Sequence, residues 1–69
     1  MRISARNQFK GTVKSVTPGA INSEVVIEIA PGIEVTAHIS NVSVGRLGLA
    51  PGKPAYALVK ADNVMVGVD

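Results

Sequence analysis

Hydrophobic and polar side chains alternate along most of this 69-residue chain, which is the pattern of β-strands that bury one face. The first alternating run begins at Phe9 and places Phe9, Gly11 and Val13 on its inward face. A glycine inside a strand indicates either a bulge or a close approach of another backbone. Residues 17–20, Thr-Pro-Gly-Ala, have the composition of a turn and end this run.

Two further alternating runs, residues 24–29 and 33–39, predict an antiparallel hairpin closed by the turn Pro31-Gly32. Their outward faces carry three glutamates and the only histidine, His38. We expect these glutamates to pair across strands with Lys10 or Lys14. The inward residues of the hairpin are Val25, Ile27, Ile29, Ile33, Val35, Ala37 and Ile39.

The alternation stops after the hairpin, at Ser40-Asn41-Val42-Ser43. Serine and asparagine are favoured N-cap residues, so Ser40 or Asn41 is expected to begin a short helical turn. Gly48 is placed to end that turn.

The last third of the chain predicts two more strands. A turn cluster at residues 50–54 precedes a fourth strand, Ala55 to Val59, and a kink from Lys60 to Asn63 separates it from a fifth, Val64 to Val68. Five short strands with a helical turn between the third and fourth predict an all-β, OB-type Greek-key barrel. The strand count leaves an SH3-like barrel open as the alternative.

Length and composition predict one domain, residues 1–69, that depends on contacts with other copies. A core of this size is marginal, and the absence of cysteine excludes disulfides and thiolate metal sites. Hydrophobic residues nevertheless make up 46% of the chain, and the mean hydropathy is +0.31. We therefore expect part of the apolar surface to be buried against further copies of the chain.

The chain shows neither an apolar run long enough to span a bilayer nor a secretory signal, so we expect a cytoplasmic protein without membrane contact. The formal net charge is +2 and the isoelectric point about 9.4. This mild positive charge favours small anions and does not require nucleic acid.

The polar residues do not predict catalysis. His38 has no neighbouring serine or carboxylate in a triad-like arrangement, and no metal-ligand spacing occurs, so we expect a protein that is not an enzyme. Nucleic-acid binding is the alternative, because OB barrels often bind single strands. Such sites use aromatic side chains to stack bases, and this chain has only Phe9, expected in the core, and Tyr56.

A donor-rich stretch opens the chain: Ser4-Ala5-Arg6-Asn7-Gln8. A guanidinium, a hydroxyl and free backbone N–H groups together suit an oxyanion, which only accepts hydrogen bonds. We interpret this stretch as one half of an oxyanion site, with the other half at Ser40 to Ser43 and at Lys60. The alternative interpretation is a solvated Arg6 and Lys60, with Ser40 and Ser43 acting only as turn and cap residues.

The chain resembles the molbindins, the small Mop-type molybdate-binding proteins, whose unit also occurs as the TOBE domain. No single motif is specific, but their order and spacing cover essentially the whole chain. The matching stretches are residues 4–8 (Ser-Ala-Arg-Asn-Gln), 10–13 (Lys-Gly-Thr-Val), 39–40 (Ile-Ser) with Ser43, 46–49 (Arg-Leu-Gly-Leu), 52–53 (Gly-Lys), 60–61 (Lys-Ala) and 64–68 (Val-Met-Val-Gly-Val).

This resemblance implies an OB-type barrel that assembles as a homohexamer, a trimer of dimers. It implies storage or buffering of molybdate and tungstate for molybdenum homeostasis, with the metal bound only as its oxyanion and without an organic cofactor. The ligands would come from two subunits at their interface. The implied binding residues are Ser4, Ala5, Arg6, Lys60 and Ala61 of one subunit and Ser40, Asn41 and Ser43 of its partner.

Asp62 departs from the pattern of this family, where a serine or another small residue is expected. A carboxylate beside Lys60 is expected to weaken anion binding or to lower its pH optimum. Molybdate is a dianion without a proton at neutral pH, so a site made only of donors suits it, and suits sulfate equally well.

Overall fold

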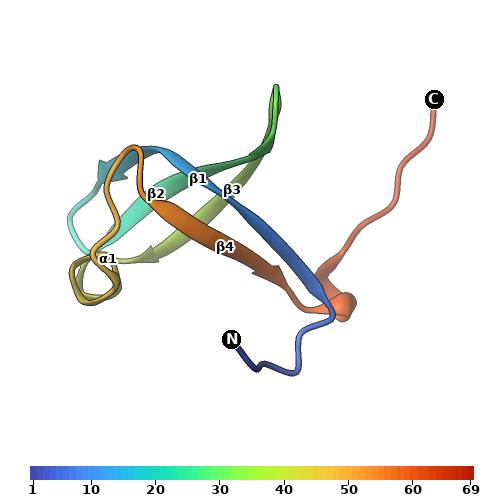
Figure 1. Cartoon of the computed structure of the whole chain (residues 1–69), viewed down its shortest axis with the longest axis horizontal. Coiled ribbons are helices and arrows are strands. Elements are labelled where there is room, and N and C mark those ends of the chain that lie inside the picture. The colour runs from blue at the N-terminus through green and yellow to red at the C-terminus, as the bar shows by residue number, and fades with distance from the viewer.

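Four strands form one antiparallel sheet in the computed structural model, which describes residues 1–69 (Figure 1). The strand order is β3-β2-β1-β4. The first three strands are joined by short turns, and β4 returns beside β1 through a connection that contains α1, which is Greek-key order. The elements are β1 (Asn7–Pro18), β2 (Asn22–Ala30), β3 (Ile33–Ser40), α1 (Asn41–Leu47), β4 (Pro54–Val59) and the 3₁₀ turn η1 (Ala61–Asn63).

β1 is longer than the sequence pattern predicted, because it begins at Asn7 and reaches Pro18. Asn7 pairs with Val59 of β4, so the strand starts two residues before the alternating run. Gly11 marks a close approach, as expected, since a Cβ there would collide with the carbonyl oxygen of Glu28 on β2. The irregular register lies elsewhere, between Val13 and Ser15.

A small apolar core lies between β1, β2 and β4. It consists of Val13, Val25, Ile27 and Ala57, and the first three of these were predicted to face inward. The prediction was wrong for Phe9, which is 40% exposed, and for Ile33, which is 55% exposed.

Both exceptions have a positional cause. Phe9 lies in the part of β1 that precedes its pairing with β2, which begins at Thr12. Ile33 is the first residue of β3, an edge strand, directly after the turn.

Hydrogen bonds fix α1 at one end of the sheet. Ser40 is its N-cap, and its Oγ accepts a hydrogen bond from the Ser43 N–H at 3.1 Å, as the sequence suggested. Gly48 ends the helix with a φ of 63°, a left-handed conformation that glycine adopts without strain. The Asn41 Nδ2 donates to the Gly19 carbonyl at 2.9 Å, and the buried hydroxyl of Ser23 donates to Asn41 Oδ1. Asn41 therefore ties the start of α1 to the β1–β2 turn.

The predicted fifth strand does not form within the chain. After η1, which occupies the predicted kink, residues 64–69 run away from the sheet and have no strand partner (Figure 1). Val66 and Val68 are 91% and 95% exposed. The four-stranded sheet therefore forms an open half-barrel instead of a closed five-stranded one.

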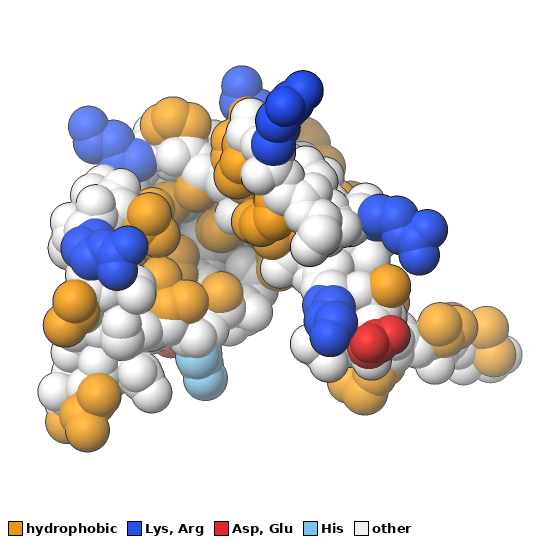
Figure 2. Space-filling model, turned by 90° about the horizontal axis from the view of Figure 1, so that it is seen from below, with side chains coloured by type: hydrophobic (Ala, Val, Ile, Leu, Met, Phe, Trp, Pro, Cys, Tyr) orange, Lys and Arg blue, Asp and Glu red, His pale blue; other side chains and the backbone are white.

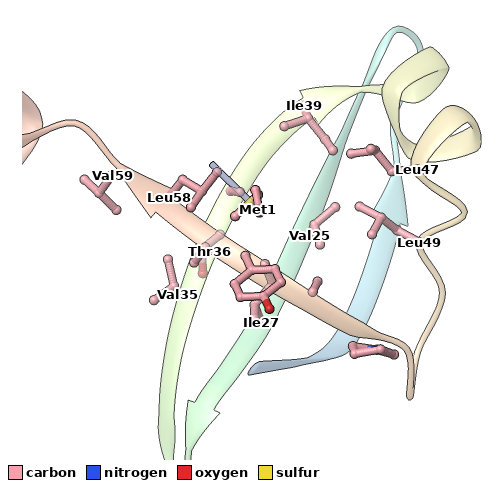
Figure 3. A pocket seen from close by; sticks show the side chains of 15 residues that line it. Met1, Val25, Ile27, Val35, Thr36, Ile39, Leu47, Leu49, Leu58 and Val59 are labelled. Carbon is pink, nitrogen blue, oxygen red and sulfur yellow. The ribbon is translucent and has the colours of Figure 1, made fainter. Parts of the chain in front are cut away.

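The open side of the half-barrel is a hollow of about 530 Å³, which we call the apolar groove (Figures 2 and 3). The two edge strands, β3 and β4, both contribute to its walls, and 13 of its 15 lining residues are hydrophobic. Its lining residues are Met1, Val25, Ile27, Val35, Thr36, Ala37, Ile39, Leu47, Leu49, Pro54, Ala55, Tyr56, Ala57, Leu58 and Val59.

Candidate oxyanion-binding site

The donor-rich start of the chain and the end of β4 meet in a second hollow of about 340 Å³, the Arg6–Lys60 pocket. The register of the sheet brings them together, because Asn7 pairs with Val59. Arg6, which precedes Asn7, and Lys60, which follows Val59, therefore leave the sheet next to each other. The Asn7 Nδ2 also donates to the Val59 carbonyl at 3.2 Å. The pocket is lined by Ile3, Ser4, Ala5, Arg6, Lys60, Ala61 and Asp62.

The charges of this pocket are two cations and one carboxylate. Arg6 forms no ion pair in the chain, whereas Lys60 Nζ lies 3.7 Å from Asp62 Oδ2. Both members of that pair are exposed, at 75% and 80% of their side-chain surface. The Arg6 guanidinium and the Ser4 hydroxyl add donors, so the pocket as a whole is suited to an anion.

Of the other predicted half of the site, Lys60 lies in this pocket, whereas the segment from Ser40 to Ser43 lies far from it. Ser40, Asn41 and Ser43 are at the start of α1, and Figure 1 shows α1 and η1 at opposite ends of the molecule. The Ser40 hydroxyl lies 2.9 Å from the Ser43 hydroxyl and caps the helix, and both polar ends of the Asn41 amide are engaged. A single chain therefore brings Ser4, Ala5, Arg6, Lys60 and Ala61 together but leaves Ser40, Asn41 and Ser43 apart.

Two lining residues were not among the predicted binding residues. Ile3 precedes the donor-rich stretch and adds an apolar wall. Asp62 was identified only as an unusual residue beside Lys60, and the structure places it in the pocket. The sequence signal for Asp62 was its departure from the family pattern beside Lys60, and no signal singled out Ile3.

Two further side-chain pairs join the strands outside the pocket. Lys14 forms an ion pair with Glu34, as the cross-strand pattern predicted, and His38 Nε2 lies 3.4 Å from Glu24 Oε1. The hydrogen bond from Lys14 to Glu34 and the charge of Glu34 raise the pKa of Lys14 above its ordinary value of 10.5. No group of three or more histidine, cysteine or carboxylate side chains is placed to hold a metal ion, and no helix has the length and hydropathy to cross a membrane.

A Greek-key half-barrel with a donor-rich pocket beside its open edge defines a small β module of the ligand-binding class. Residues 3–66 match the TOBE domain, so the chain belongs to this family. The resemblance to the molbindins is thereby confirmed.

Similar proteins carry names that refer to molybdenum. The chain is 48% identical over 69 residues to a probable molybdenum-pterin-binding protein of Haemophilus influenzae, with all of both chains covered. It is 47% identical over 66 residues to molybdenum-pterin-binding protein 1 of Clostridium pasteurianum, which covers 96% of this chain and 97% of that protein.

Two solved structures support the same relationship. MopII from Clostridium pasteurianum superposes with a TM-score of 0.90 at 45% identity and covers 97% of this chain and 100% of that one. The cytoplasmic molybdate-binding protein ModG, solved with molybdate bound, gives a TM-score of 0.94 at 45% identity. All of this chain corresponds to 49% of the ModG chain. The names of the two sequence relatives and of ModG describe binding proteins.

Proposed function

We propose that this chain is a non-enzymatic binding protein that takes up molybdate or tungstate inside the cell and stores or buffers it. The observation that carries the proposal is the convergence of Ser4, Arg6 and Lys60 in one pocket of a chain with molybdenum-binding relatives. The ModG structure, which holds molybdate and is described as cytoplasmic, supports the ligand and the location.

The chemistry of the pocket fits a tetrahedral dianion. Arg6 presents a planar fork of N–H donors, Lys60 a compact ammonium and Ser4 a hydroxyl, while backbone groups near Ala5 and Ala61 supply further contacts. Molybdate carries two negative charges and only accepts hydrogen bonds. Charge-assisted hydrogen bonds of this kind are stronger than those between neutral groups.

A neighbouring copy is proposed to complete the site with Ser40, Asn41 and Ser43. These residues lie at the opposite end of the chain from the Arg6–Lys60 pocket, so they can join it only from a second copy (Figure 1). The hydrogen bond between the Ser40 and Ser43 hydroxyls uses one of their two protons, so the other hydroxyl proton remains available to an anion.

The exposed surface supports assembly. The chain exposes 5394 Å², whereas a folded monomer of this mass is expected to expose roughly 4,100 Å². The excess is larger than the roughly 800 Å² that one partner buries in a standard interface. The large hydrophobic residues that remain exposed are Met1, Ile3, Phe9, Ile21, Ile33, Val42, Leu47, Tyr56, Leu58, Val64, Met65, Val66 and Val68.

The C-terminal segment, residues 64–68, is the part of a second copy that fits the apolar groove. It is extended, unpaired and apolar, and the groove lies between two edge strands with unpaired backbone groups (Figures 1 and 2). Insertion from a second copy would supply the fifth strand and close an OB-type barrel. We therefore propose a homohexamer, a trimer of dimers, with residues 1–69 of each copy as one binding domain.

Isothermal titration of the whole protein with molybdate, sulfate and single-stranded RNA tests the proposed function. We expect micromolar or tighter binding of molybdate and no binding of RNA at moderate salt. RNA binding without molybdate binding would instead identify the chain as an OB-type module for nucleic acid and would overturn the proposal.

A further inference from the structure

Asp62 is the one lining residue of the Arg6–Lys60 pocket whose side chain only accepts hydrogen bonds. Its carboxylate lies 3.7 Å from the Lys60 ammonium, so the two pair within the chain before any anion arrives. Arg6, the other cation of the pocket, has no such partner. The pocket therefore contains a competitor for one of its own two cations.

A carboxylate in this position acts on a bound dianion in two ways. It competes for Lys60, and it repels the anion directly. For a carboxylate about 6 Å from a dianion in a water-like dielectric, the repulsion alone corresponds to roughly a tenfold loss of affinity. Because both side chains are largely exposed, this repulsion is subject to screening by salt.

The same carboxylate can accept a hydrogen bond from an oxyanion that still carries a proton. The hydrogen phosphate ion, the main form of phosphate near pH 7.5, carries two negative charges like molybdate, so the repulsion is the same for both ions. Hydrogen phosphate also has an O–H group, which can donate to the Asp62 carboxylate, and such a hydrogen bond is stronger than one between neutral groups.

We propose that Asp62 is a specificity-determining residue of the Arg6–Lys60 pocket: it lowers affinity for fully deprotonated tetrahedral dianions and partly spares singly protonated ones. This inference rests on the proposed function, because it concerns the same pocket. It predicts that the ratio of molybdate affinity to phosphate affinity is smaller in this pocket than in the same pocket without the carboxylate.

The test is isothermal titration of the wild-type protein and the Asp62→Asn variant with molybdate, sulfate and phosphate near pH 7.5. Asparagine keeps the size of the side chain, removes its charge and weakens its acceptor. We expect the affinities for molybdate and sulfate to rise about tenfold in Asp62→Asn. The factor by which the phosphate affinity rises should be smaller by about threefold or more. Raising the salt concentration from about 50 mM to about 500 mM should shrink the difference between variant and wild type.

Glu28→Gln is the matched control, because it makes the same change in net charge at an exposed position of β2 outside the pocket. It should leave all three affinities within about twofold of wild type. The inference is overturned if Asp62→Asn binds molybdate within twofold of wild type, or if phosphate affinity rises by the same factor as molybdate affinity. If wild type and variant both fail to bind any of the three anions, the proposed function and this inference are both overturned. If both bind the anions with the same affinities, only the inference about Asp62 is overturned.

Discussion

Arg6 is the residue whose chemistry most restricts what the pocket can bind. It is exposed and unpaired, so its donors are available to a ligand without first breaking an ion pair. Arg6→Ala removes a charge-assisted interaction of about 1.5–3 kcal/mol, and molybdate affinity should drop by about one to two orders of magnitude. Titration calorimetry of the variant measures this loss.

Arg6→Lys separates charge from geometry. A lysine keeps the charge but replaces the planar fork with a point charge, so it should recover only part of the lost affinity. The far-UV circular dichroism of both variants should match wild type, because Arg6 lies before β1 and outside the core. Parental molybdate affinity in a folded Arg6→Ala protein would show that this residue does not bind the anion.

At the level of residues, side-chain type indicated the candidate site, but not which candidates are neighbours. Ser4, Arg6 and Lys60 were identifiable as donors from the sequence, and the molbindin resemblance grouped them. Their proximity depends on the pairing of Asn7 with Val59, a register between strands 52 residues apart in the chain. Local patterns contain no information about such a register.

Among the elements, alternation predicted the hairpin of β2 and β3 and the buried faces of Val13, Val25 and Ile27. The alternation pattern gave a wrong prediction for Phe9, which is exposed although it lies on the predicted inward face. It also gave a wrong prediction for residues 64–68, which form no strand within the chain. An apolar extended segment has the same pattern whether its partner strand belongs to its own chain or to another. The prediction of a fifth strand at residues 64–68 was therefore wrong within the chain, where this segment has no strand partner.

The ion pair between Lys14 of β1 and Glu34 of β3 gives a prediction for alkaline pH. The pKa of Lys14 is raised in the folded state by its hydrogen bond to Glu34 and by the charge of Glu34, so this pair stabilises the fold fully below pH 10.5, the ordinary lysine value. Its contribution is lost as the pH rises through the higher folded pKa. The melting temperature of wild type minus that of Glu34→Gln should be constant up to about pH 9.5 and should fall above it.

Glu34 also lies directly opposite Glu28 on the neighbouring strand. Glu34→Gln therefore relieves a repulsion as well as breaking the pair, and the absolute difference in melting temperature is expected to be small. Lys14 is the member of the pair whose pKa lies in the alkaline range, so the pH dependence of the difference is attributed to Lys14. A difference that is flat from pH 8 to the highest pH at which the protein is folded would contradict this account.

At the scale of the whole molecule, the open groove and the exposed C-terminal segment predict a stable oligomer without ligand. Light scattering at micromolar concentration should give about six times the chain mass of 7.1 kDa. Deletion of residues 64–69 removes the segment proposed to fill the groove of another copy and should reduce the measured mass. A wild-type mass of one chain would rule out the assembly.

The proposed division of the site between two copies gives the last prediction. Lys60 lies in the pocket of one copy, and Ser40 would come from another, so Lys60→Ala and Ser40→Ala proteins each contain only defective sites. When equal amounts are refolded together, some sites combine Lys60 of a Ser40→Ala chain with Ser40 of a Lys60→Ala chain and are therefore intact. Random assortment makes roughly a quarter of the sites intact in this way. Molybdate titration should detect them as a tight-binding fraction that neither variant shows alone.

Two measurements make this experiment decisive. Ser40 also caps α1, and its replacement by alanine is expected to cost about 1 kcal/mol of stability, so native mass spectrometry must first confirm that mixed oligomers have formed. Mixing each variant with wild type then calibrates how the tight-binding fraction depends on composition. Because affinity follows the donors around one anion and not the average composition of the oligomer, a site contained within one chain gives no recovery at any mixing ratio. Confirmed mixed oligomers without a tight-binding fraction would show that Lys60 and Ser40 do not share a site between copies.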